Sequence, residues 1–204
     1  ALGFEKKGSA GALLYSKTAV SKTTGLYINY AIAVNHQAFK EIVDILGGID
    51  IILDKPFRED QQFSKEMIID LPAGQNHLNG TSTLYFVRSR FTTSDFDRAR
   101  RQQQVALAIK DKAFSLGVIS NPVKIFQILN SLGKNVRLDL PLSQIKNLIV
   151  MAENFGDQKI VHKVFDTTEE GLLYASKTES GAYILLPVGD DFKKIQEVCQ
   201  NIFN

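Results

Sequence analysis

Five arginines stand close together between residues 86 and 105, and their side chains are suited to binding a multiply charged anion. The segment reads FVRSRFTTSDFDRARRQQQV and contains Arg88, Arg90, Arg98, Arg100 and Arg101. A guanidinium group stays charged at any working pH and donates hydrogen bonds in pairs to phosphate oxygens. Several such groups converging on one place would make a site for a phosphate or pyrophosphate.

The second half of this segment is expected to form a helix from Ser94 to about Phe114. Ser94 or Asp95 can cap its start, and good helix formers follow without Gly or Pro. On a helix, Asp95, Arg98 and Gln102 fall within one narrow arc. Asp95 is then placed either to orient an arginine or to accept a proton.

The other arginines depend on how their own segments run. Arg101 lies beside this arc, whereas Arg100 points to the far side of the helix. Arg88 and Arg90 come before the helix and are two residues apart. They can reach one site if their segment is extended or irregular, but not if it is a regular helix.

Two other interpretations fit an Arg- and Gln-rich helix. It can be a solvated face with ordinary ion pairs. It can also bind nucleic acid, but that function needs a broad basic surface, and the chain has a net charge of only +2 and a pI near 8.6. We therefore expect no nucleic-acid partner.

The chain is expected to form one α/β domain over residues 1–204, with a mixed central sheet flanked by helices. Strands are predicted at Tyr27–Val34 and Ile49–Leu53, with a helix over about Gln37–Leu46 between them, so the two strands should be parallel. Gly74–Gly80 is expected to be a loop. No run of about 18 apolar residues occurs, and no membrane span is expected within these residues.

Three blocks of this sequence resemble the LytR-CpsA-Psr (LCP) family, in the family's order and spacing. They are VNHQAFKEIVDILGGIDI (Val34–Ile51), LPAGQNHLNGTSTLYFVRSR (Leu71–Arg90), and RSR followed by SDF-x-R-x-x-RQQQ-V. The chain resembles the C-terminal, larger part of the family's catalytic domain. Two positions depart from the usual pattern: Thr93 stands where many members carry Asp, and Asp97 where many carry Gly. Because Asp97 is negative, it should point away from the anion site.

The resemblance implies an extracytoplasmic, membrane-anchored phosphotransferase. Members of the family transfer a glycopolymer from a polyprenyl-pyrophosphate lipid to the peptidoglycan of the cell wall by forming a phosphodiester, and pyrophosphatase activity is also possible for them. The residues that the resemblance assigns to the pyrophosphate are Arg88, Arg90, Arg98, Arg101 and Gln102, with Arg101 as a supporting member. The residues that it assigns to catalysis are Arg88, Arg90, Asp95 and Arg98.

The family also carries an earlier segment whose carboxylates are associated with a divalent metal. The resemblance therefore implies Mg²⁺ or Mn²⁺, with its ligands, the front strands of the sheet and the membrane anchor expected upstream of Ala1. No metal ligand is expected within this chain. This leaves two alternatives to an active phosphotransferase: a non-catalytic module that binds the polyprenyl pyrophosphate and, less favoured, a basic-helix nucleic-acid binder.

Overall fold

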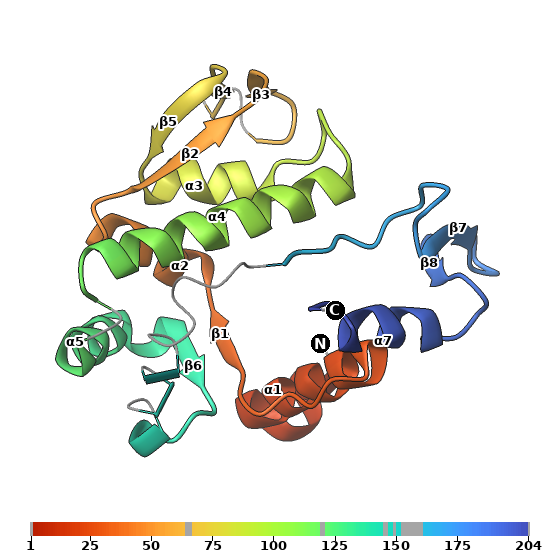
Figure 1. Ribbon diagram of the computed structural model, residues 1–204, viewed down its shortest axis with the longest axis horizontal. Coiled ribbons are helices and arrows are strands. Elements are labelled where there is room, and N and C mark those ends of the chain that lie inside the picture. Colours follow the sequence, from red (N-terminus) through yellow and green to blue (C-terminus); the bar gives the residue numbers. More distant parts are fainter. Residues whose placement is uncertain are drawn as a thin grey trace. The chain divides into compact units, whose positions relative to one another are not determined.

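The chain divides into two units (Figure 1). One unit contains Ala1–Ala33, Leu138–Leu140 and Lys159–Asn204, and the other contains Val34–Arg137 and Pro141–Gln158. The computed structural model describes residues 2–63, 67–118, 121–144, 147–148, 150–151 and 161–203. The single domain expected over residues 1–204 stays a prediction.

The described residues of the first unit include two helices and a β-hairpin. Helix α1 (Leu2–Thr24) packs against α7 (Lys193–Gln200), and the Gln196 side chain of α7 donates a hydrogen bond to the carbonyl of Lys22 at 2.9 Å. Strands β7 (Leu173–Lys177) and β8 (Tyr183–Pro187) pair antiparallel. Within the described ranges, no helix has both the length and the apolar character that crossing a membrane requires.

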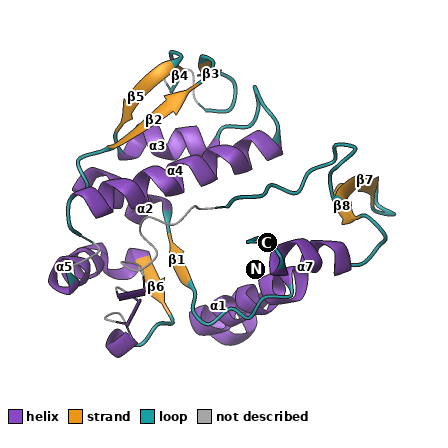
Figure 2. Cartoon of the chain, in the orientation of Figure 1, coloured by secondary structure: helices purple, strands orange, loops and turns teal. Residues whose placement is uncertain are grey.

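The second unit carries the arginine-rich segment and alternates short strands with helices (Figure 2). Strand β1 (Ile32–Val34) spans the boundary in sequence between the two units. The elements that follow it, in chain order, are α2 (His36–Ile45), β2 (Ile49–Leu53), β3 (Phe57–Glu59), β4 (Ile69–Leu71), β5 (Gly74–Leu78), α3 (Gly80–Arg88), α4 (Asp95–Ser115), α5 (Pro122–Leu132), the short 3₁₀ turn η1 (Gly133–Asn135), β6 (Val136–Leu138), whose last residue belongs to the first unit, and the 3₁₀ turn η2 (Leu142–Gln144).

The mixed α/β class is confirmed, but the strands are arranged differently from the expectation. Within each unit the described strands pair two by two, β2 with β5 and β3 with β4 in the second unit and β7 with β8 in the first, rather than forming one central sheet. The predicted parallel pairing of Tyr27–Val34 with Ile49–Leu53 is wrong, because only Ile32–Val34 of the first segment is a strand and β2 pairs antiparallel with β5 instead.

The actual partner of β2 is β5, in the segment that was predicted to be a loop. The two strands run antiparallel, with Ile49 opposite Leu78 and Ile51 opposite Asn76. Ile49, Ile51 and Leu78 are all buried, so the register places these three apolar side chains on the face toward the core. The apolar pattern of a single strand identifies the strand but does not identify its partner, which explains the error.

The core of this unit lies where α2, α3 and α4 meet the β2–β5 pair. In Figure 1, α3 and α4 lie side by side against these strands, and both helices contact the pair. Seven buried apolar residues form one cluster there: Val43, Ile49, Ile51, Leu78, Phe86, Val87 and Val105. Because Phe86 and Val87 belong to this cluster, the end of α3 is held in the core just before Arg88.

The start of α3 is fixed by a close approach to α2. The Asn79 side chain caps α3 by accepting a hydrogen bond from the backbone of Ser82 at 2.9 Å. The Gly80 N–H donates to the Asp44 carboxylate of α2 at 2.7 Å. A Cβ atom on Gly80 would lie 2.2 Å from the carbonyl oxygen of Lys40, so only glycine allows the two helices to approach this closely.

Candidate functional site

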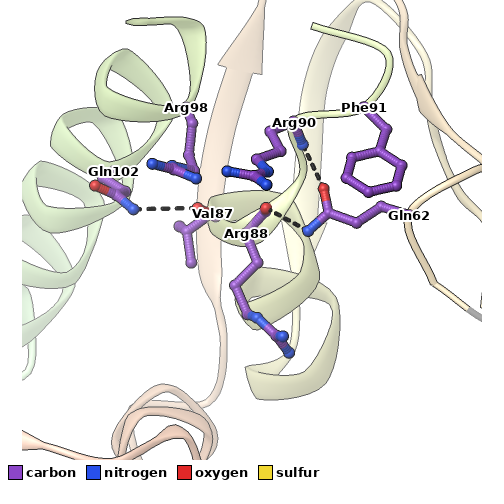
Figure 3. Close-up of a pocket in the computed structure, with 7 residues that line it drawn as sticks. All are labelled: Gln62, Val87, Arg88, Arg90, Phe91, Arg98 and Gln102. Atoms are coloured by element: carbon purple, nitrogen blue, oxygen red, sulfur yellow. Dashed lines mark hydrogen bonds between the residues drawn. The ribbon is translucent and has the colours of Figure 1, made fainter. Parts of the chain in front are cut away.

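A pocket of about 430 Å³ opens where α3 ends and α4 begins (Figure 3). Its lining comes from the loop after β3, the end of α3 with the turn that follows, and the first turns of α4: Gln62, Val87, Arg88, Arg90, Phe91, Arg98 and Gln102. The structure therefore brings together four residues that the sequence assigned to one site: Arg88, Arg90, Arg98 and Gln102.

The start of α4 agrees with the prediction and explains the position of Asp97. Ser94 is the N-cap: its hydroxyl accepts a hydrogen bond from the Asp97 N–H at 3.0 Å, and the Asp97 carboxylate accepts from the Ser94 N–H at 3.1 Å. Asp97 also pairs with Arg100 at 3.0 Å. The Ser94 hydroxyl also donates to Asp97, and this bond is the main cause that lowers the Asp97 pKa. Asp97 serves the helix cap and does not line the pocket, as expected from its charge.

Two of the arginines face each other across the pocket. Arg90 and Arg98 both direct a guanidinium group toward the pocket, as Figure 3 shows. Their Nη1 atoms lie 3.8 and 3.2 Å from the same oxygen, Oδ1 of Asp95. One carboxylate thus stands beside two cations, which leaves net positive charge to bind an anion.

Arg88 shares the pocket wall, but its guanidinium points elsewhere. It is the last residue of α3, and the backbone leaves the helix at Ser89, so Arg88 and Arg90 reach the same pocket in the irregular way that the sequence argument required. In Figure 3 the Arg88 side chain runs away from Arg90 and Arg98. Its guanidinium lies 5.7 Å from the ring centre of Phe63. The guanidinium groups of Arg90 and Arg98 therefore converge on the pocket as expected, whereas that of Arg88 points away from them.

Arg101 is buried and supports the site from inside the protein. Only 7% of it is exposed, and its guanidinium donates to the carbonyl oxygens of Phe86, at 3.0 Å, and of Ser89. It also lies over the Phe57 ring at 4.8 Å. Burial lowers the pKa of this guanidinium, although an arginine remains charged. Arg101 thus holds the end of α3 and does not line the pocket. Its predicted supporting part in binding the pyrophosphate stays a prediction.

Gln62 is a pocket residue that the sequence argument missed. Its side-chain amide donates to the carbonyl of Arg88 at 2.8 Å and accepts from the N–H of Arg90 at 2.6 Å (Figure 3). Gln102 of α4 similarly donates to the carbonyl of Val87 at 3.3 Å. Gln62 lies 26 residues before Arg88 in a polar loop, and no periodicity or motif in the sequence marks it.

The described residues do not by themselves make a site for a divalent cation. In the described ranges, no three side chains of His, Cys, Asp or Glu lie close enough together to hold a metal ion. The carboxylate beside the pocket, Asp95, is already paired with two guanidinium groups. The Mg²⁺ or Mn²⁺ implied by the family resemblance stays a prediction.

The sequence of this chain is similar to those of curated transferases. The polyisoprenyl-teichoic acid–peptidoglycan teichoic acid transferase TagU of Bacillus cereus (strain ATCC 14579) is 34% identical over 166 residues, which cover 76% of this chain and 51% of TagU. The chain thus spans about half the length of the curated relatives that it matches.

Solved structures share the fold over nearly the whole chain. The Lin1025 protein from Listeria innocua is 25% identical with a TM-score of 0.68, covering 98% of this chain and 79% of that one. A structure of TagT bound to LIIa-WTA is 19% identical with a TM-score of 0.66, covering 98% of this chain and 69% of that one, a likeness of fold alone.

The family itself is settled by a match over most of the sequence. The model of the LytR_cpsA_psr family matches residues 6–201. This range includes all three sequence blocks and every residue that lines the pocket. The chain belongs to the LytR-CpsA-Psr family.

Proposed function

We propose that this chain transfers a glycopolymer from a polyprenyl-pyrophosphate carrier to peptidoglycan, as a phosphotransferase that forms a phosphodiester. The observation that carries the proposal is the pair Arg90 and Arg98, which face each other across a pocket with Gln102 on its wall. The name of the related TagU, a transferase of polyisoprenyl-linked teichoic acid to peptidoglycan, supports the same reaction class.

The chemistry fits an arginine pocket. A hydroxyl of the acceptor sugar attacks the phosphorus attached to the glycopolymer, the bond between the two phosphates breaks, and polyprenyl phosphate leaves. Negative charge increases on the leaving phosphate, where positioned guanidinium groups stabilise it. Asp95 stands beside both arginines, so it is the candidate group to take the proton from the attacking hydroxyl.

The proposal also includes the location of the enzyme, its membrane anchor and its metal ion. A lipid carrier and a cell-wall acceptor place the enzyme outside the cytoplasm at the membrane surface, held there by an anchor. Mg²⁺ or Mn²⁺ is included as the ion that would offset the charge of the pyrophosphate. Family membership supports these points. The described residues supply the arginines and Asp95 to the reaction.

Binding of geranylgeranyl pyrophosphate, a short soluble polyprenyl pyrophosphate, tests the site directly. Arg90→Ala and Arg98→Ala should each weaken binding by at least about 1.5 kcal/mol, roughly tenfold, because a charge-assisted hydrogen bond is lost. Arg100→Ala is the matched control, since it removes the same charge from the same helix outside the pocket. Unchanged affinity in both pocket variants would reject the proposal.

Transfer itself is tested with a labelled glycopolymer on a polyprenyl pyrophosphate, peptidoglycan as acceptor, and Mg²⁺ or Mn²⁺. We expect label in the peptidoglycan and release of polyprenyl phosphate, both reduced in Arg90→Ala and Arg98→Ala. Tight binding of the lipid without transfer or pyrophosphate cleavage would instead identify a binding-only module.

A further inference from the structure

One buried carboxylate joins the two loops that border the pocket. Glu59, at the end of β3, is 0% exposed. Its Oε1 atom accepts hydrogen bonds from the backbone N–H groups of Gln61 and Gln62, at 3.0 and 3.1 Å. Its Oε2 atom accepts from the N–H groups of Phe91 and Thr92, at 3.0 and 3.2 Å. Each oxygen therefore holds one loop, although the loops lie about 30 residues apart in sequence.

The loop held by the first oxygen carries the residue that fixes the arginines. The N–H of Gln62 binds Glu59, and its side chain binds the backbone of both Arg88 and Arg90. The second oxygen binds the two residues directly after Arg90. The backbone that carries Arg88 and Arg90 is thus bound on one side by Gln62 and at its end by Glu59.

These contacts require an ionised carboxylate, because both of its oxygens accept hydrogen bonds and neither carries a hydrogen. Four backbone N–H groups point at this side chain, and a buried N–H without a partner is unfavourable. Burial alone would raise the pKa of Glu59, but the hydrogen bonds from these N–H groups outweigh it and hold the pKa below its ordinary value. Glutamine in this place would direct its NH₂ group at two of the donors.

We propose that Glu59 is a positioning residue of the pocket, which acts with Gln62 to set the backbone of Arg88 and Arg90 so that the Arg90 guanidinium faces Arg98. Glu59 does not itself line the pocket. The inference rests on the proposed pyrophosphate-binding role of the pocket. It predicts that the carboxylate controls how well the pocket distinguishes a diphosphate from a monophosphate, because a second phosphate needs the second guanidinium at the correct separation.

The test is the ratio of affinities for geranylgeranyl pyrophosphate and geranylgeranyl monophosphate. This ratio does not change when a variant merely lowers the fraction of folded protein. The wild-type chain should favour the pyrophosphate, and Arg90→Ala should reduce that preference. Glu59→Gln should reduce it at least about fivefold, whereas Glu59→Asp, which keeps both oxygens, should recover part of it.

A double variant tests whether Glu59 acts through Arg90. If it does, adding Glu59→Gln to Arg90→Ala should change the ratio by less than about twofold, because residues that act through one another are not additive. Gln61→Ala is the matched control, since it removes an exposed neighbouring side chain and keeps the N–H that binds Glu59; its ratio should equal that of the wild type.

Each outcome separates this inference from the proposed function. If the wild-type chain does not favour the pyrophosphate, the proposed role of the pocket fails. If it does and Arg90→Ala loses the preference, but Glu59→Gln keeps it, the positioning role of Glu59 is overturned. Should Glu59→Gln not fold, Gln62→Leu replaces it, because it removes both bonds to the Arg88–Arg90 backbone and leaves Glu59 in place; an unchanged ratio there overturns the inference equally.

Discussion

Arg98 places its Nη1 atom 3.2 Å from Oδ1 of Asp95, which lies three residues earlier on the same face of α4. Both residues belong to the first turns of a helix whose start is set by the Ser94–Asp97 capping box. The carboxylate and the guanidinium therefore already lie together at the start of the helix. Arg90, from the segment before α4, reaches the same oxygen at 3.8 Å, so Asp95 is placed either to orient the two cations or to act in the reaction.

Asp95→Asn separates these roles. Removing a negative charge next to an anion site should leave pyrophosphate affinity unchanged or increase it, since like charges repel. If Asp95 takes the proton of the attacking hydroxyl, the transfer rate should fall at least about a hundredfold. The measurements are the Kd for geranylgeranyl pyrophosphate and kcat for glycopolymer transfer. A weaker affinity with an unchanged kcat would show that orienting the arginines is its only role.

Arg101→Lys should destabilise the fold although it keeps the charge. A lysine ammonium cannot reproduce the two bonds of the guanidinium to the carbonyls of Phe86 and Ser89, nor its stacking on Phe57. We expect the free energy of unfolding, measured with urea, to fall by about 2–4 kcal/mol. Arg100→Lys, on the exposed side of the same helix, should change it by less than about 0.5 kcal/mol. Equal effects would contradict the structural role of Arg101.

Acid should weaken the fold partly through Glu59. A group whose pKa is lower in the folded state stabilises the protein above its unfolded pKa, and this contribution is lost as the pH falls through the folded pKa. The Glu59 pKa lies below its ordinary value of 4.5. The wild-type chain should therefore lose stability as the pH drops below about 4.5.

Glu59→Gln removes this titration, so its stability should be lower than that of the wild type at pH 7 and should fall less steeply in acid. Urea unfolding of both proteins from pH 7 to pH 3 gives the two curves. Taking their difference cancels other carboxylates with lowered pKa values, such as Asp97. Parallel curves would show that the Glu59 carboxylate is not selectively stabilised in the folded state.

Gly80→Ala should loosen the contact between α2 and α3. The new methyl group would meet the Lys40 carbonyl oxygen at 2.2 Å, and a backbone atom cannot rotate away as a side chain can. We expect a loss of about 1–3 kcal/mol in the free energy of unfolding, as for other overpacked sites. Thr81→Ala, at the next and exposed position, is the control. A Gly80→Ala protein as stable as this control would mean that the helices separate without strain.

The parts of the site that the sequence predicted are those determined by local rules. The α4 cap and the arc that holds Asp95, Arg98 and Gln102 follow from residue types within a few turns of one helix. The direction of the Arg88 side chain does not, because it depends on where α3 ends and on the nearby Phe63 ring.

Contacts between residues that are distant in the sequence were not predicted from the sequence. The pairing of β2 with β5 is one, since apolar alternation fits more than one partner. The contacts of Glu59 and Gln62 with the segment after α3 are another, because they join residues that only the folded chain brings together.

Between Phe86 and Thr92, side chains from elsewhere bind seven backbone groups: the carbonyls of Phe86, Val87, Arg88 and Ser89, and the N–H groups of Arg90, Phe91 and Thr92. A segment held at so many points has little conformational freedom left to lose when a ligand arrives. Association should therefore carry a small entropic cost for the backbone of this segment. In calorimetric terms, most of the ordering entropy is expected to come from the lipid and its polymer.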